Sequence, residues 1–429
     1  MRILHTSDWH LGARLHTKSR LDEQLFFLEW LHDLIADQSV DALVVAGDIF
    51  DTAIPATGVQ GAWLDFLVSL RDTGCRHVVA IGGNHDSFSL LNAWSPVLKF
   101  LNVHVVGGVS ESIDDQVLVL RDQAGLPELI VGAVPFLREA DVSRSVAGET
   151  PSMALDRIAQ GIADYYEGVR GRIDVVHAEL VERHGAETVA GSPPVVLTGH
   201  LFVEGYLTAE GERRLYVGNL GAVSDSIFPG NADYVALGHL HKAQRIRNDQ
   251  TIRYSGSPLQ LGFDEAGENK FVYLVDFVGP SGTPATVQHV QVPVWHHMAV
   301  ISEPDIQSIV DGLKALDQAG EPVWADVRYV GEAPEVDLRG KVSEAVEGGV
   351  VDVLRIGDKY RARAVIQADQ AAEPLEQYSP ERIFQLRLDA ETLTDEQKAK
   401  LILLHERVVH SLQSPDDVAG VTGAEGGAR

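Results

Sequence analysis

The sequence has very little of what would cross-link it or anchor it in a membrane. Its 429 residues include one cysteine, Cys75, so no disulfide can form within the chain, and a reducing, cytoplasmic setting is favoured. No apolar run reaches the length of about 18 residues that a membrane-spanning helix requires. Polar residues return directly after Ile3 and Leu4, so we expect neither a signal peptide nor a membrane-bound protein.

Positive charge is also scarce. The chain has 35 lysine and arginine residues against 62 aspartate and glutamate residues, and its formal net charge is -27. This balance argues against a protein that holds nucleic acid through a broad basic surface of its own. It does not exclude nucleic acid as a substrate, because bound divalent cations or a basic partner can attract phosphates locally. The length favours two or three domains.

The first part of the chain alternates between short apolar runs and helical stretches. Apolar runs at residues 3–5, 42–46 and 77–81 predict strands, and the leucines between residues 21 and 35 recur at helical spacing. A second helical stretch separates the second and third strands. This order predicts β-α-β units whose parallel strands are buried on both faces.

A polar cluster follows each of these strands. The clusters are TSDWH, GDIFD and GGNHD, and two later apolar runs end in GH and GHLH. Because the carboxyl ends of parallel strands lie at one edge of a sheet, we expect the clusters to converge. Imidazole, carboxylate and amide ligands without a thiolate suit two ions that share a carboxylate, with Mn, Fe or Zn favoured over Ca or Mg. The candidate metal ligands are Asp8, His10, Asp48, Asn84, His200, His239 and His241.

The composition changes near residue 278. We expect a first domain at residues 1–278, a linker, and a small βαββαβ-like unit at residues 289–366. Ser379 and Pro380 are typical of a helix start, and apolar residues then recur at helical spacing, so we expect helices within residues 367–413. Residues 414–429 have the composition of a disordered tail.

Taken together, the motifs D-x-H, GD-x-x-D, GNHD, GH and GH-x-H resemble those of the calcineurin-like metallophosphoesterases. Longer stretches, among them LHTSDWHLG, GGNHDS and YSGSPLQLGFDE, are similar to the SbcD nuclease subunits, bacterial relatives of the Mre-type nucleases. The resemblance is specific over roughly the first 275 residues and looser beyond them. It implies an α/β fold: a metallophosphoesterase β-sandwich flanked by helices, a small α/β capping domain at residues 289–366 and partner-binding C-terminal helices.

The resemblance also implies a role for each motif residue. His85 would protonate the leaving group, with Asp86 orienting its ring; a His85 that only positions phosphate is the alternative. Asp51 stands where archaeal relatives often carry a histidine, so a second catalytic histidine is not expected there. Residues 254–258 are either a phosphate contact or simply a turn. The implied metal sites are Asp8, His10 and His241 for one ion, Asn84, His200 and His239 for the other, with Asp48 bridging the two.

The implied function is that of a manganese-dependent deoxyribonuclease in DNA repair and recombination. Such an enzyme would degrade double-stranded DNA ends and cut hairpins or blocked ends together with an SbcC-type ATPase, as a homodimer within a heterotetramer. A cytoplasmic, nucleoid-associated location is implied as well. Two other functions stay open: a different phosphoesterase reaction, or a DNA-tethering scaffold with a vestigial metal site. Thr52 and Ala53 replace the Arg-Gly of protein phosphatases, and the complete ligand set argues against a vestigial site.

Overall fold

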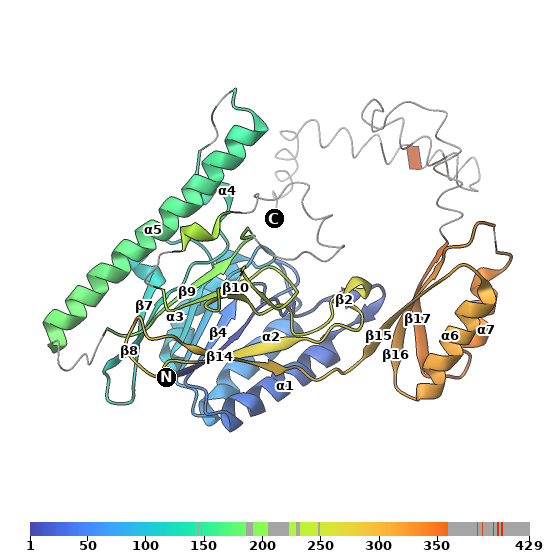
Figure 1. Cartoon of the computed structure of the whole chain (residues 1–429), viewed down its shortest axis with the longest axis horizontal. Helices are drawn as coiled ribbons and strands as arrows, with labels where there is room; N and C mark the ends of the chain where they lie inside the picture. The colour runs from blue at the N-terminus through green and yellow to red at the C-terminus, as the bar shows by residue number, and fades with distance from the viewer. Residues whose placement is uncertain are drawn as a thin grey trace, which may run out of the picture.

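The computed structural model describes residues 1–144, 146, 148–185, 192–204, 223–228, 232–247, 249–333 and 335–358, with six single positions beyond them. The helices expected at residues 367–413 lie outside the described residues except at positions 384, 388, 398, 401, 402 and 405, and the tail at 414–429 lies wholly outside them. Two six-stranded sheets and one three-stranded sheet dominate the described part (Figure 1). No helix in that part is long and apolar enough to cross a membrane.

The first six-stranded sheet contains the three strands expected near the start of the chain. Its parallel strands are β1 (Arg2–Thr6), β4 (Ala42–Ala46), β5 (His77–Ile81) and β6 (Val103–Val106). The antiparallel strands β13 (Phe271–Asp276) and β14 (Thr286–Gln291) extend its other edge. The connecting helices are α1 (Leu21–Asp37), α2 (Thr57–Ser69) and α3 (Phe88–Leu98). Each pair of parallel neighbours is joined by a helix because a tight turn can connect only antiparallel strands. A parallel connection must carry the chain back along the sheet before the next strand begins.

The second six-stranded sheet has the order β11-β12-β10-β9-β8-β7. It is built from β7 (Val117–Arg121), β8 (Pro127–Gly132), β9 (Val195–His200), β10 (Tyr234–Gly238), β11 (Gln244–Arg245) and β12 (Ile252–Tyr254). The long helix α5 (Pro151–His184), green in Figure 1, runs along this part of the molecule. Its buried Tyr166 donates a hydrogen bond to the carbonyl of Thr198 at 3.0 Å, which ties the helix to β9.

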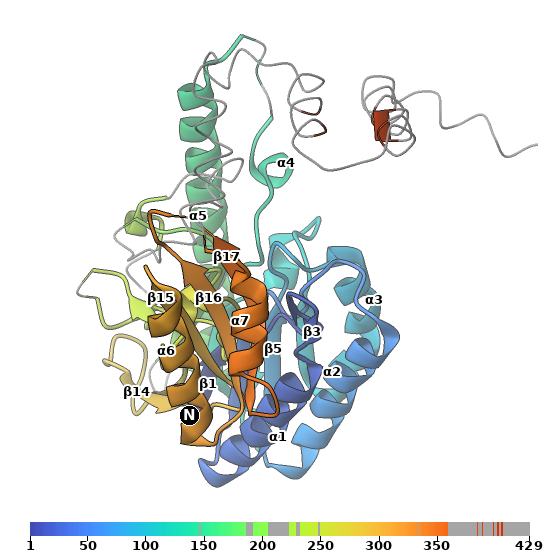
Figure 2. The same cartoon turned by 90° about the vertical axis from the view of Figure 1, so that its right-hand side faces the viewer.

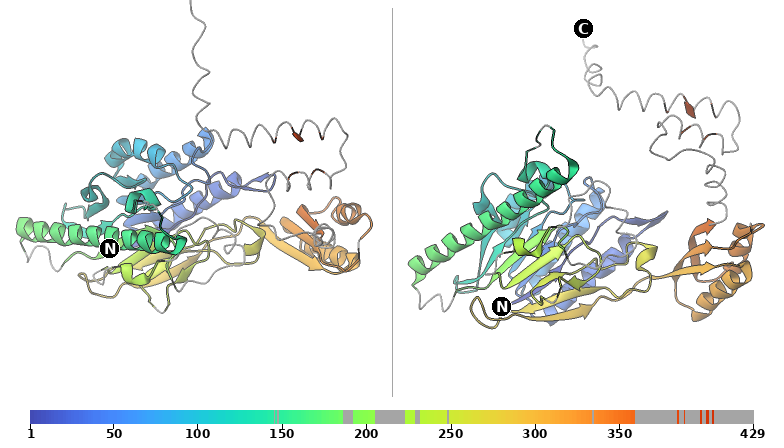
Figure 3. Two further views of the ribbon diagram at one scale, coloured as in Figure 1. Left: turned by 90° about the horizontal axis from the view of Figure 1, so that it is seen from above. Right: turned by 45° about the horizontal axis from the view of Figure 1, so that its top comes forward.

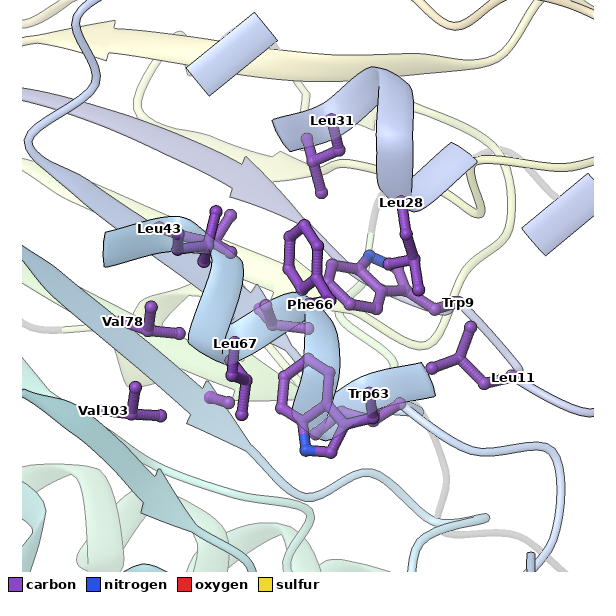
Figure 4. Packing of buried hydrophobic residues seen from close by; sticks show 14 of the residues in the cluster. Trp9, Leu11, Leu28, Leu31, Leu43, Trp63, Phe66, Leu67, Val78 and Val103 are labelled. Atoms are coloured by element: carbon purple, nitrogen blue, oxygen red, sulfur yellow. The ribbon is translucent and has the colours of Figure 1, made fainter. Parts of the chain in front are cut away.

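The two sheets pack face to face, and helices cover their outer faces. Between the sheets lies a cluster of fully buried side chains that includes Val44, Val79 and Val196. All five residues of β4 are buried, as its continuous apolar sequence predicts. On the helical side, Trp9 contacts the Trp63 and Phe66 rings of α2 with centroid separations of 5.4 and 5.6 Å (Figure 4). The sandwich flanked by helices confirms the expected fold class.

The small domain is simpler than expected. It contains β15 (His297–Glu303), α6 (Ile306–Ala319), β16 (Val323–Tyr329), α7 (Leu338–Ala345) and β17 (Val351–Asp358). Over the described residues 297–333 and 335–358 the order is βαβαβ, one strand fewer than the expected βαββαβ, because each neighbouring pair of this parallel sheet is joined through a helix. The helices α6 and α7 lie side by side on one face of the sheet (Figure 2).

The boundary between the two parts also lies later than expected. Residues 278–285 form the turn of a hairpin, and β14 then pairs with β13 over six residues. The chain therefore stays with the first sheet to Gln291, past the expected boundary at residue 278. Beyond it, the small domain sits at one end of the molecule (Figure 3), where Met298 and Trp324 pack against Leu15 and Phe263 of the sandwich.

Candidate metal centre

The seven candidate ligands all follow or end strands of the two sheets. Asp8 and His10 follow β1, Asp48 follows β4, and Asn84 follows β5 in the first sheet. In the second sheet His200 ends β9, and His239 and His241 follow β10. Four of these residues have positive φ: Asp8 at 55°, His10 at 45°, Asp48 at 49° and His239 at 98°. Residues other than glycine rarely adopt this conformation, and such strain is concentrated at functional sites.

Glycines allow the strand ends to approach one another closely. A Cβ atom on Gly83 would lie 2.1 Å from Oδ1 of Asp48, and one on Gly238 would lie 2.0 Å from the carbonyl oxygen of Ala46. Neither position accepts a side chain without movement of the backbone. Gly238 therefore lets the edges of the two sheets meet at this point, and Gly83 lets the loop after β5 lie against the loop after β4 within the first sheet.

The ligand atoms form two groups that share the Asp8 carboxylate. Oxygen or nitrogen atoms of Asp8, His10 and His241 lie within 4.8 Å of one another, as do those of Asp8, Asp48 and His200. Oδ2 of Asp48 lies 3.5 Å from Nε2 of His10 and 3.3 Å from Nε2 of His200. One carboxylate oxygen of Asp48 thus stands between an imidazole of each group.

The amide of Asn84 completes the second group. Its Oδ1 lies 3.0 Å from Nε2 of His200 and 2.9 Å from Nδ1 of His239, and these two ring nitrogens are 3.3 Å apart. Nδ1 of His200 lies 2.9 Å from the carbonyl of Ala46 and donates to it, so Nε2 is the nitrogen that can bind a cation once it has lost its proton. His239 differs from His200, because it turns Nδ1 toward the cluster.

Burial and charge shift the pKa values of these groups strongly. Burial raises the pKa of Asp48, but the charge and hydrogen bond of His200 outweigh it, and the net shift is downward. Burial lowers the pKa of His200, whereas Asp48 raises it to about 9. The two side chains therefore form a buried, charged pair. A divalent cation held by them would replace the proton of His200, because ligating imidazoles are neutral.

His85 is exposed beside this cluster. Its backbone N–H donates to Oδ1 of Asp48 at 2.9 Å, and its ring lies 4.8 Å from the ring of His10, centroid to centroid. Nδ1 lies 2.9 Å from the carbonyl oxygen of Asp51. A carbonyl only accepts, so Nδ1 carries hydrogen and Nε2 is the nitrogen that exchanges a proton.

Asp86 does not have the expected role of orienting the His85 ring. Its carboxylate accepts hydrogen bonds from the backbone N–H groups of Ile49, Phe50 and Gly83 at 3.1, 2.9 and 2.9 Å. The carbonyl of Asp51 contacts the His85 ring instead. Asp86 therefore joins the loop after β4 to the loop after β5, and it holds the backbone that carries the ligands.

Sequence reasoning missed three side chains that support the ligands. Asp51, for which no site role is expected from the sequence, places Oδ1 3.3 Å from Nδ1 of His10. Glu265 places Oε1 3.2 Å from Nδ1 of His241. Ser255, in the segment interpreted as a phosphate contact or a turn, lies 2.7 Å from the hydroxyl of Ser7, which contacts Asp8. Two of the three, Ser255 and Glu265, lie inside YSGSPLQLGFDE. The resemblance of this stretch to the SbcD nuclease subunits was the signal that could have pointed to them.

Comparison with known families fits this geometry. Residues 1–243 match the family described as calcineurin-like phosphoesterases, and residues 294–392 match the family described as the type 5 capsule protein repressor C-terminal domain. The first match covers more than half of the chain. The fold and the site are thus those of a calcineurin-like phosphoesterase.

Whole-chain relatives define the family more narrowly. The SbcD subunit of the nuclease SbcCD of Escherichia coli (strain K12) is 36% identical over 414 residues, which cover 96% of this chain and 98% of that protein. The protein of the same name from Bacillus subtilis (strain 168) is 38% identical over 292 residues, which cover 68% and 69%. The chain belongs to the SbcD family of calcineurin-like phosphoesterases.

Proposed function

We propose that this protein is a metal-dependent DNA nuclease that hydrolyses phosphodiesters at a two-metal centre. The observation that carries the proposal is the position of Asp48, whose Oδ2 lies between Nε2 of His10 and Nε2 of His200. Two cations about 3.5–4 Å apart would neutralise the phosphodiester and supply a hydroxide nucleophile near neutral pH. The proposed ligand sets are Asp8, His10 and His241 for one ion and Asn84, His200 and His239 for the other, with Asp48 shared.

His85 is the proposed general acid. The Asp51 carbonyl holds Nδ1, so a proton on Nε2 is the one available to the departing sugar oxygen. Such assistance typically contributes ~10²–10⁴-fold to the rate. In the alternative, the exposed ring only positions the phosphate. The two roles differ in their dependence on the leaving group, because a weakly basic leaving group needs no proton.

The proposed partner, DNA substrates and assembly rest on the similarity of this chain to its relatives. The match of nearly the whole chain to the SbcD subunit of a nuclease named SbcCD supports an SbcC-type ATPase as partner. We further propose exonuclease action on double-stranded DNA ends, endonuclease action on hairpins, and a homodimer within the larger complex. The small domain would act as a capping domain and residues 367–413 as partner-binding helices. A net charge of -27 agrees with a chain that relies on cations and a partner to hold DNA.

The test compares the purified full chain with His85→Ala on three substrates: linear duplex DNA, hairpin DNA and bis(4-nitrophenyl) phosphate. His32→Ala on α1 is the control, since His32 pairs with Asp33 on the helix surface. We expect cleavage with Mn and a loss of ~10²–10⁴-fold on DNA in His85→Ala, with a much smaller loss on the nitrophenyl ester. Equal losses on both substrates would assign His85 to phosphate positioning instead.

Metal content is measured on the same samples, because it separates the remaining outcomes. Two bound ions per chain with hydrolysis of the nitrophenyl ester but not of DNA would show a working phosphoesterase that is not a DNA nuclease by itself. Two bound ions with hydrolysis of no substrate would reject the enzyme and favour the DNA-tethering scaffold. Comparison of Mn with Mg and Zn tests the metal preference that the mixed nitrogen and oxygen ligands suggest.

A further inference from the structure

We infer that Glu265, held by Lys270, is a positioning residue that fixes the ring of His241 for metal binding. The inference rests on the proposed metal centre and adds two residues that have no place among its ligands. Glu265 ends the short 3₁₀ turn η6 (Phe263–Glu265), 24 residues after His241 in the chain. It reaches the site because the segment after β12 lies against the loop that carries His241, where the Ser257 N–H donates to the His241 carbonyl at 3.1 Å.

The contact between Glu265 and His241 selects one nitrogen for the metal. Oε1 of Glu265 lies 3.2 Å from Nδ1 of His241. An ionised carboxylate only accepts, so Nδ1 carries the hydrogen and the lone pair is placed on Nε2. Histidine ligands commonly donate their second nitrogen to a carboxylate in this way, which orients the ring and raises its basicity. A similar arrangement orients His200 through a backbone carbonyl, 2.9 Å from its Nδ1.

Lys270 holds both the carboxylate and the backbone of the ligand. Its Nζ lies 2.5 Å from Oε2 of Glu265, 3.0 Å from the carbonyl oxygen of His241 and 3.2 Å from Oγ of Ser257. The Leu261 N–H donates to the same Glu265 oxygen at 3.1 Å. His241 is thereby attached at its ring and at its main chain to one ion pair.

The cost of burying this ion pair argues for a functional reason. The side chains of Lys270 and Glu265 are 6% and 8% exposed. Removing two charges from water costs several kcal/mol per ion, and an apolar pair of similar size is often as stable or more stable. Stability alone therefore does not account for the pair. A separate contact attaches the turn that carries Glu265 to the small domain, because Phe263 is buried in one cluster with Met298 and Trp324.

The experiment measures metal binding by calorimetry and metal content in the full-length chain. We expect Glu265→Ala to weaken binding at one of the two sites by ~10–100-fold, with the other site unchanged. Glu265→Gln should weaken it less, because its amide oxygen can still accept from Nδ1. The matched control is Glu268→Gln in the same segment. It breaks a half-exposed ion pair in which Oε1 of Glu268 lies 2.9 Å from Nζ of Lys242, and it should leave the metal affinities of both sites unchanged.

A double variant, Glu265→Met with Lys270→Met, separates positioning from folding. It replaces the ion pair with apolar side chains, so thermal unfolding should be little changed while binding at one site remains weakened. Full metal affinity in this folded variant would overturn the inference and leave the metal centre intact. Failure of the unaltered chain to bind two ions would instead overturn the proposed function, and the inference with it.

Discussion

Removal of the Asp86 carboxylate tests how the two loops of the metal centre are held together. In Asp86→Ala, the buried N–H groups of Ile49, Phe50 and Gly83 lose their acceptor. A hydrogen bond to a charged group contributes about 1.5–3 kcal/mol. At the lower value, three such bonds amount to roughly 4–5 kcal/mol. We expect a loss of about 4 kcal/mol in the free energy of unfolding, a large share of the ~5–15 kcal/mol typical of a domain.

Asp86→Asn should cost about half as much. Oδ2 accepts from Ile49 and Gly83, whereas Oδ1 accepts from Phe50 alone. An asparagine oxygen in the Oδ2 position keeps two bonds, and its amide then meets the Phe50 N–H donor to donor. The expected loss is about 2 kcal/mol. Burial and the charge of Asp48 raise the pKa of Asp86 to about 6, so measurement at about pH 8 keeps the carboxylate ionised.

The assay is denaturant unfolding in the presence of a chelator, followed by tryptophan fluorescence. Trp9 and Trp63 are buried in the sandwich and report its unfolding. Asp122→Ala is the control, because Asp122 accepts two backbone hydrogen bonds of 2.8 Å in a surface turn, where water can replace it. Its expected cost is about 1 kcal/mol. If Asp86→Ala costs no more than Asp122→Ala, the three hydrogen bonds do not hold the loops as argued.

Two further predictions concern residues that are not candidate ligands. Burial lowers the pKa of His5 to about 3, so the unfolded chain binds its proton first as the pH falls below about 6.5. The free energy of unfolding should therefore fall by ~2 kcal/mol between about pH 7 and about pH 5 because of His5, and urea unfolding of His5→Gln should show a fall that is smaller by that amount; parallel pH profiles of the two proteins would refute this. Gly238→Ala forces a Cβ to within 2.0 Å of the Ala46 carbonyl and should cost at least about 2 kcal/mol. In Gly61→Ala, within α2, the added Cβ meets no atom within 4 Å, and the variant should be more stable than the unaltered chain by about 1 kcal/mol. Thermal unfolding of Gly238→Ala and Gly61→Ala tests both expectations.

The strand ends and the polar residues beyond them could be predicted from the sequence alone. Continuous apolar runs such as residues 42–46 occur where a strand is buried on both faces, and β4 has those bounds. Parallel order then requires the clusters after β1, β4 and β5 to lie at one edge. For that reason the sequence predicts that Asp8, His10, Asp48 and Asn84 converge. His200, His239 and His241 belong to the second sheet and join them only where the two sheets pack together.

Contacts between distant side chains could not be predicted in this way. Asp51, Asp86 and Glu265 are acids near motif residues, and the sequence alone does not tell which ring or backbone group each one reaches. Their partners depend on left-handed turns at Asp8, His10 and Asp48 and on the packing of one loop against another. The pairing of β14 with β13 likewise depends on an edge that forms only when the sheet is assembled. The sequence by itself determined which residues could bind metal and at which edge, because strand burial and polar strand ends are local properties. Only the tertiary structure decided how those residues are held, because orientation depends on groups that are distant in the chain.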